Sequence, residues 1–90
     1  MAIPKAEASL PKKVRKTVQA AEKTIDDTIE ERFPEHEYAE IEITPFIYGN
    51  DLESSEKDSV MSELRRRYES KGWNVFFYFN MDEGLQLILD

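Results

Sequence analysis

Two apolar segments near the end of the chain, separated by turn residues, limit the possible folds more than any other feature. Residues 73–79 are apolar at every position except Asn74, and residues 80–84 have the composition of a hairpin loop that ends in glycine. In residues 85–89 three leucines alternate with other side chains. The pattern predicts a β-hairpin whose first strand is apolar on both faces, so both sides of the sheet need cover.

A long helix is predicted over residues 10–33. Pro34 ends it, because the residue before a proline avoids helical backbone angles. Ser9 can cap the first turn, where Pro11 is tolerated. Apolar residues at spacings of three and four form one narrow stripe, namely Val14, Val18, Ala21, Ile25 and Ile29. So narrow a stripe suits packing against another helix, including one from a second copy of the chain.

Residues 38–48 alternate between apolar and polar side chains, which predicts a strand with one wet face. The inward face would hold apolar residues and the outward face polar ones: Ala39, Ile41 and Ile43 against Glu40, Glu42 and Thr44. Pro45 has no backbone N–H to donate to a neighbouring strand, so the strand lies at an edge of the sheet or kinks there. Residues 49–51 have turn chemistry.

A second helix is predicted over residues 55–71. Ser55 and Asp58 have the spacing of an approximate capping box. The apolar face consists of Val60, Met61, Leu64 and Tyr68. Gly72 stands where a left-handed cap belongs, and Trp73 follows it, able to pack back onto Tyr68 in a Schellman arrangement.

These elements predict an α+β fold in the order α-β-α-β-β, with a three-stranded antiparallel sheet packed with two helices. Residues 1–9 are expected to be a flexible arm, and residues 10–90 a single domain. Phe76, Tyr78 and Ile88 need cover from the first helix or from another molecule. We therefore expect a homo-oligomer, with the long helix as one possible interface.

The charge of the chain, −7 overall, is unevenly distributed. Residues 1–19 carry five basic side chains and one acidic one, whereas residues 20–63 carry fourteen acidic and three basic ones. Such asymmetry favours interaction surfaces. The chain has no cysteine, no apolar run of membrane-spanning length and no apolar signal segment at its start. A cytoplasmic protein is expected.

Residue types that carry common catalytic chemistry are scarce. His36 is the single histidine and is expected to be a solvated loop residue. The three glycines stand apart at positions 49, 72 and 84, so no phosphate-binding loop is present. The sequence predicts no catalytic residue, no cofactor site and no metal site. An enzyme that uses the acids of the first helix with a bound cation remains the alternative from another class.

Two charge clusters are the candidate binding sites. A protein partner would contact the acidic helix face and the acidic strand face, through Asp27, Glu30, Glu31, Glu40 and Glu42. The same acidity could instead imitate the phosphates of DNA. The alternative is nucleic-acid binding by the basic start of the first helix, through Lys12, Lys13, Arg15 and Lys16. Arg65, Arg66 and Arg67 lie beside Tyr68 and Trp73, but these aromatic residues suit the core better.

The sequence R-Y-x-x-x-G-W-x-V, at residues 67–75, joins the second helix to the hairpin. Over residues 55–89 this arrangement resembles small accessory proteins encoded by tailed bacteriophages. The resemblance rests on structural residues and carries no catalytic residue across. It implies a protein that acts in the cytoplasm of an infected host and that binds a host protein complex, which it inhibits or redirects.

Overall fold

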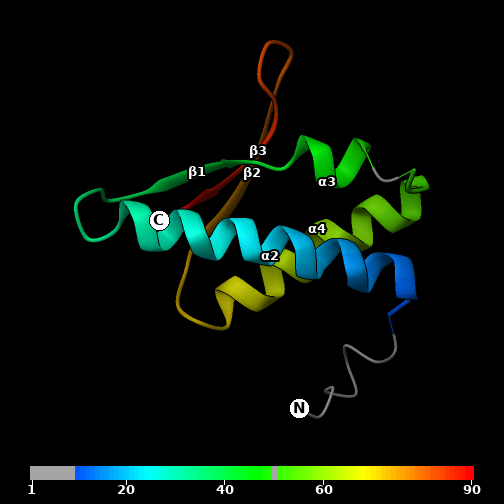
Figure 1. The fold of residues 1–90 in the computed structure, drawn as a ribbon, viewed down its shortest axis with the longest axis horizontal. Coiled ribbons are helices and arrows are strands. Elements are labelled where there is room, and N and C mark those ends of the chain that lie inside the picture. Colours follow the sequence, from blue (N-terminus) through cyan, green and yellow to red (C-terminus); the bar gives the residue numbers. More distant parts are fainter. Residues whose placement is uncertain (1–9, 50) are drawn as a thin grey trace.

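Three antiparallel strands and two long helices, packed on one face of the sheet, form the fold (Figure 1). The computed structural model describes residues 10–49 and 51–90, so the arm expected at residues 1–9 lies outside the described residues. The elements are α2 (Lys12–Arg32), β1 (Ala39–Glu42), α3 (Thr44–Tyr48), α4 (Ser54–Glu69), β2 (Val75–Asn80) and β3 (Gly84–Leu89). The predicted α+β class and element order are confirmed, and α3 is an additional short helix.

The sheet has the strand order β1-β3-β2, with β3 in the centre. Ile41 of β1 lies opposite Leu87 of β3, which in turn lies opposite Phe77 of β2. The face that carries these residues packs against α2 and α4, and the end of the β2–β3 hairpin projects beyond the helices (Figure 1). Leu87 and Leu89 are fully buried, so the core is centred on β3.

The apolar stripe of α2 is buried inside the chain. Val14, Val18, Ala21 and Ile25 have no exposed surface, and Ile29 packs against the same core. The stripe is therefore covered by the chain's own sheet and helices and is not free for a second copy. The helix ends before Pro34 as predicted. Pro11 is the N-cap residue of α2, and the predicted cap at Ser9 lies outside the described residues.

The strand predicted over residues 38–48 is shorter than expected. Its alternation holds over β1, where Ala39 and Ile41 are buried, but Thr44–Tyr48 forms α3 instead. Pro45 can occupy the first turn of a helix, because the backbone N–H that proline lacks would have no acceptor within the helix at that position. The Thr44 hydroxyl accepts a hydrogen bond from the Leu85 N–H at 2.8 Å, which fastens the start of α3 to β3.

The helix α4 begins slightly earlier than predicted, and its cap uses other residues. Glu53 and Glu56 form the capping box, with the Glu53 N–H donating to Glu56 Oε1 at 2.9 Å, rather than Ser55 and Asp58. The predicted C-terminal cap is confirmed: Gly72 has a φ of 97°, and the Trp73 N–H donates to the Tyr68 carbonyl at 3.1 Å. The Trp73 ring packs edge-on against Phe33, with ring centroids 5.0 Å apart.

Candidate functional site

The face of the sheet that the helices leave uncovered is acidic at one edge and aromatic at the other. The strand register sets Glu40 beside Ile88 and Phe76 in one row, and Glu42 beside Gln86 and Tyr78 in the next. Phe76 and Tyr78 are 52% and 54% exposed. The first helix does not cover these aromatic residues, because α2 and α4 both lie on the opposite face.

Two shallow hollows meet at the outer edge of β1 and share Arg32, Glu40 and Glu42. One hollow extends to α2, where Glu31, Thr24 and Thr28 line it, and to His36 in the segment that follows this helix. The other extends over the uncovered sheet face to the hairpin turn, where Asp82 and Glu83 line it. We call the five carboxylates around these hollows the acidic surface: Glu31, Glu40, Glu42, Asp82 and Glu83.

The structure brings together only part of the predicted acidic site. Glu31, Glu40 and Glu42 converge, whereas Asp27 and Glu30 are exposed on the side of α2 that faces away from the core. Asp82 and Glu83 are members that the sequence analysis missed. They reach the site because β3 pairs directly with β1, which brings the hairpin turn toward Glu42, and strand order is not encoded in any local pattern.

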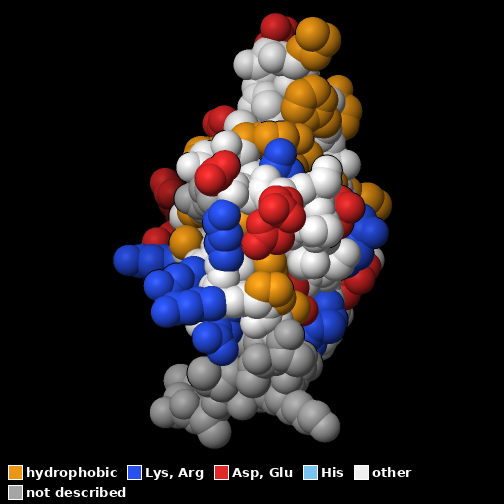
Figure 2. Space-filling model, turned by 90° about the vertical axis from the view of Figure 1, so that its right-hand side faces the viewer, with side chains coloured by type: hydrophobic (Ala, Val, Ile, Leu, Met, Phe, Trp, Pro, Cys, Tyr) orange, Lys and Arg blue, Asp and Glu red, His pale blue; other side chains and the backbone are white. Residues whose placement is uncertain are grey.

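The basic residues named as the nucleic-acid alternative lie at the opposite end of α2 from Glu31. Lys12, Lys13 and Lys16 are exposed and Arg15 is half-buried, and Figure 2 shows basic side chains gathered near the start of this helix. Lys13 Nζ donates a hydrogen bond to the backbone carbonyl of Asp51. Lys13 and Lys16 also line a shallow hollow. The two charge clusters are therefore about a helix length apart, roughly 30 Å for α2.

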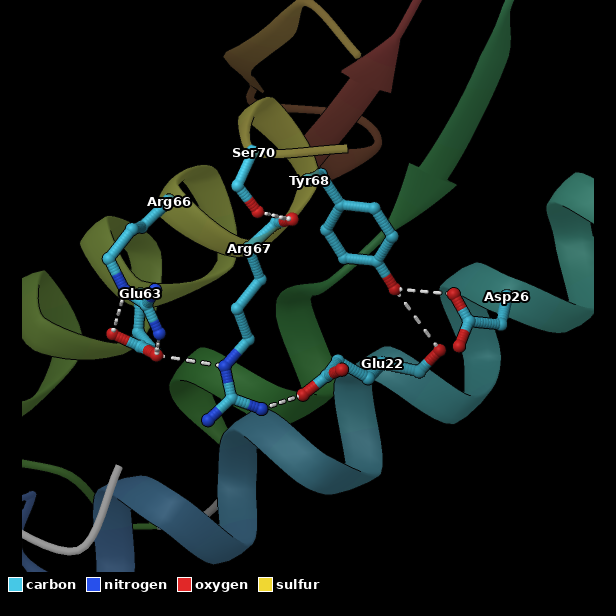
Figure 3. Close-up of polar contacts among 7 residues, drawn as sticks. All are labelled: Glu22, Asp26, Glu63, Arg66, Arg67, Tyr68 and Ser70. Carbon is cyan, nitrogen blue, oxygen red and sulfur yellow. Dashed lines mark hydrogen bonds and ion pairs between the residues drawn. The ribbon is translucent and has the colours of Figure 1, made fainter. Parts of the chain in front are cut away.

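A third charged cluster lies between α4 and α2 (Figure 3). Arg66 and Arg67 both bind the buried Glu63, with Nε to carboxylate distances of 3.1 and 2.8 Å, and Arg67 also pairs with Glu22 of α2. The hydrogen bond from Arg66, followed by that from Arg67, holds the pKa of Glu63 below its ordinary value although burial opposes this. Arg67 therefore joins the two helices, whereas Arg66 binds Glu63 within α4. Used in this contact, Arg67 is not part of the basic aromatic surface considered above.

Tyr68 is the buried aromatic residue of this contact. It is 3% exposed, which confirms its predicted place in the core, and its hydroxyl donates to Asp26 Oδ1 at 2.7 Å. Burial, together with the nearby carboxylate of Asp26, raises the pKa of Tyr68 far above its ordinary value of 10.0.

The raised pKa of Tyr68 predicts a loss of stability at high pH. The unfolded chain can ionise this phenol near pH 10 and the folded chain cannot, so its contribution is complete below pH 10 and is lost as the pH rises above it. We expect phenolate absorbance to show one of the four tyrosines titrating only as the chain unfolds. A Tyr68→Phe variant should lose that step and about 1 kcal/mol of stability. Titration of all four tyrosines in the folded chain would contradict the prediction.

No three His, Cys, Asp or Glu side chains within residues 10–49 and 51–90 are arranged to hold a metal ion. In the same part of the chain, none of the helices combines the length and apolar character needed to cross a membrane. Comparisons of the chain with protein-family models, with curated proteins and with solved structures found no match. The class that the structure defines is therefore a three-stranded α+β domain with an acidic surface at one sheet edge.

Proposed function

We propose that this protein is a non-enzymatic interaction module that docks onto another macromolecule through the acidic surface. The observation that carries the proposal is the convergence of carboxylates from α2, β1 and the hairpin turn around two open hollows. The face of the sheet beside these carboxylates is not covered by α2 or α4, and it carries the exposed Phe76 and Tyr78. A charged rim next to an apolar patch is the usual composition of a protein-binding surface.

The partner would be a protein with a basic patch. Charges at the rim of an interface mainly guide the approach of the partner and select the correct one, whereas the exposed Phe76 and Tyr78 can supply apolar contact. The resemblance of residues 55–89 to phage accessory proteins supports a host protein complex as this partner, which the protein would inhibit or redirect in the host cytoplasm.

A second candidate function is nucleic-acid binding at the start of α2. The exposure of Lys12, Lys13 and Lys16 on one short stretch of helix favours it. The two functions use opposite ends of α2, so separate substitutions distinguish them. An acidic DNA mimic is a third possibility, and it would depend on the total negative charge more than on the position of each carboxylate.

The docking proposal predicts that the two carboxylates of β1 contribute to binding of the partner, whereas two carboxylates on the outer side of α2 do not. We expect a tagged wild-type chain to capture one specific protein from lysate of its native host, and a Glu40→Gln/Glu42→Gln variant to bind the purified partner about tenfold more weakly. The matched control is Asp27→Asn/Glu30→Gln, which removes the same charge from the outer side of α2 and should bind as the wild type does. Affinities are measured by calorimetry at two salt concentrations.

Three results would contradict the docking proposal. Equal weakening by both double variants would indicate a mimic that acts through overall charge. Binding of DNA or RNA that falls steeply with salt and is lost in Lys13→Gln/Lys16→Gln would favour the nucleic-acid function. Turnover of a substrate that is abolished by one substitution in a hollow would identify an enzyme.

A further inference from the structure

The two edges of the sheet differ in how they are protected against pairing with another strand. β1 is four residues long and carries two exposed glutamates, and a short edge strand with charged side chains resists pairing. β2 is six residues long and contains neither a charge nor a proline. The β2 edge therefore lacks the features by which proteins block the addition of a strand.

Backbone hydrogen-bonding groups point outward from this edge. Asn74 and Asp90 exchange both of their backbone hydrogen bonds at 3.1 Å, which fixes the alternation of inward and outward groups along β2. The N–H and C=O groups of Val75, Phe77 and Phe79 therefore point away from β3. No backbone partner for these groups occurs within residues 10–49 and 51–90.

Exposed apolar side chains gather on the same strand and its turn. Phe79 is 59% exposed and Met81 is 94% exposed, in addition to Phe76 and Tyr78. Figure 2 shows hydrophobic side chains gathered at the end of the molecule where the hairpin projects. Beside Phe77, a hollow of about 340 Å³ opens between β2 and α4 and is lined by Met61 and Arg65 among others.

We propose that β2 pairs with β2 of a second copy, antiparallel and about a two-fold axis at Phe77, to form a six-stranded sheet. The outward backbone groups of one copy must face those of the other. All three outward residues are paired only when Phe77 lies opposite Phe77 of the partner subunit and Val75 opposite Phe79 of the partner subunit. The same register places Phe76 beside Tyr78 of the partner subunit on the uncovered face. The partner subunit's Phe77 would lie at the hollow beside α4.

The charges around β2 favour a second copy as the occupant. A chain with a net charge of −7 repels its copies over most of its surface, but residues 72–81 carry no charge. Lys71 precedes this uncharged stretch and Asp82 and Glu83 follow it. Antiparallel pairing brings the Lys71 end of one copy to the Asp82 end of the other, so opposite charges meet at both ends of the interface.

This dimer goes beyond the docking function and does not depend on it. The β1 edges, with Glu31, Glu40 and Glu42 of the acidic surface, lie at the two far ends of the six-stranded sheet and stay free, whereas Asp82 and Glu83 lie near the ends of the β2 interface. A dimer would therefore present two acidic surfaces to its partners. Loss of docking with an intact dimer would count against the proposed function alone.

The first test is the mass of the full chain in solution over a range of concentrations. We expect sedimentation equilibrium to give twice the chain mass of 10.5 kDa at the higher concentrations. Phe79→Lys places a charge on the edge and should raise the dissociation constant at least about tenfold. The matched control is Tyr38→Lys, because Tyr38 is 52% exposed and precedes the other edge. It should change the constant by less than about twofold.

The second test locates the interface, first in the wild-type chain and then by a cross-link. Hydrogen exchange of the wild-type chain should show the amides of Val75, Phe77 and Phe79 protected at dimer concentrations and exchanging faster on dilution. In a chain without cysteine, Phe77→Cys should give a disulfide-linked dimer under mild oxidation, whereas Tyr38→Cys should not. A chain that stays monomeric at millimolar concentration, or a dimer in which these amides gain no protection, would overturn the proposal.

Discussion

Replacement of Leu87 by alanine is expected to remove about 3 to 4 kcal/mol from the free energy of unfolding. Leu87 is fully buried in the central strand, where it lies between Ile41 of β1 and Phe77 of β2. Truncation would leave a cavity that neither neighbouring strand can fill without breaking its register. A domain of 90 residues has a total stability of about 5 to 13 kcal/mol, so the variant is expected to lose a large part of it.

Urea unfolding, followed by circular dichroism and by the fluorescence of Trp73, measures this loss. The matched control is Ile88→Ala in the next position of the same strand, which points to the uncovered face and is half-buried. We expect a loss of about 1 kcal/mol for the control, since part of its side chain is already in water. Equal losses for the two variants would mean that the helices do not cover the face assigned to them.

The second large effect is expected for Arg67→Met, at about 2 to 3 kcal/mol. Arg67 bridges Glu63 of α4 and Glu22 of α2, and its side chain is 15% exposed. Methionine keeps the apolar stem but leaves the Glu63 carboxylate, itself 9% exposed, with fewer hydrogen bonds and near a like charge. The substitution should therefore weaken the contact between the two helices.

Arg66→Met is the matched control for Arg67, because both arginines hydrogen-bond Glu63. The Arg66 bond has the larger influence on the pKa of Glu63, but its side chain is 54% exposed and lies on the same helix as Glu63. Water can replace much of this contact, so we expect a loss below about 1 kcal/mol. Urea unfolding measures the loss of stability in each variant. A larger loss for Arg66→Met than for Arg67→Met would show that the Arg67 bridge to α2 contributes little.

The lowered pKa of Glu63 makes part of the free energy of unfolding depend on pH in the acidic range. The folded pKa lies below the unfolded value, so this contribution is complete above about pH 4.5 and is lost as the pH falls below it. A Glu63→Gln variant should have lower stability at neutral pH. Its stability should then decrease less than that of the wild type as the pH falls through this range.

Three of the five carboxylates of the acidic surface could be predicted from the sequence. Glu40 and Glu42 follow from the alternation of the first strand, and Glu31 from the acidic face of the long helix. Asp27 and Glu30 were predicted with Glu31, because residues on a polar helix face look alike until the direction of the neighbouring strand is known. Asp82 and Glu83 were missed because the pairing of β3 with β1, rather than any local pattern, brings the hairpin turn to the site.

The sequence by itself determined the local elements. Spacing of apolar residues gave the two long helices and the three strands, Pro34 ended α2, and Gly72 with Trp73 closed α4. These features depend on backbone angles and on a period of two or about four residues, which neighbouring residues alone can specify.

The tertiary structure decided what those elements do together. It placed β3 between β1 and β2, put both long helices on one face, and thereby left an acidic edge at β1 and an uncharged edge at β2. It also converted Thr44–Tyr48 into a helix and buried Glu63 beside Arg67. Such outcomes depend on contacts between residues more than forty positions apart, such as Thr44 with Leu85, and no local pattern of side chains contains them.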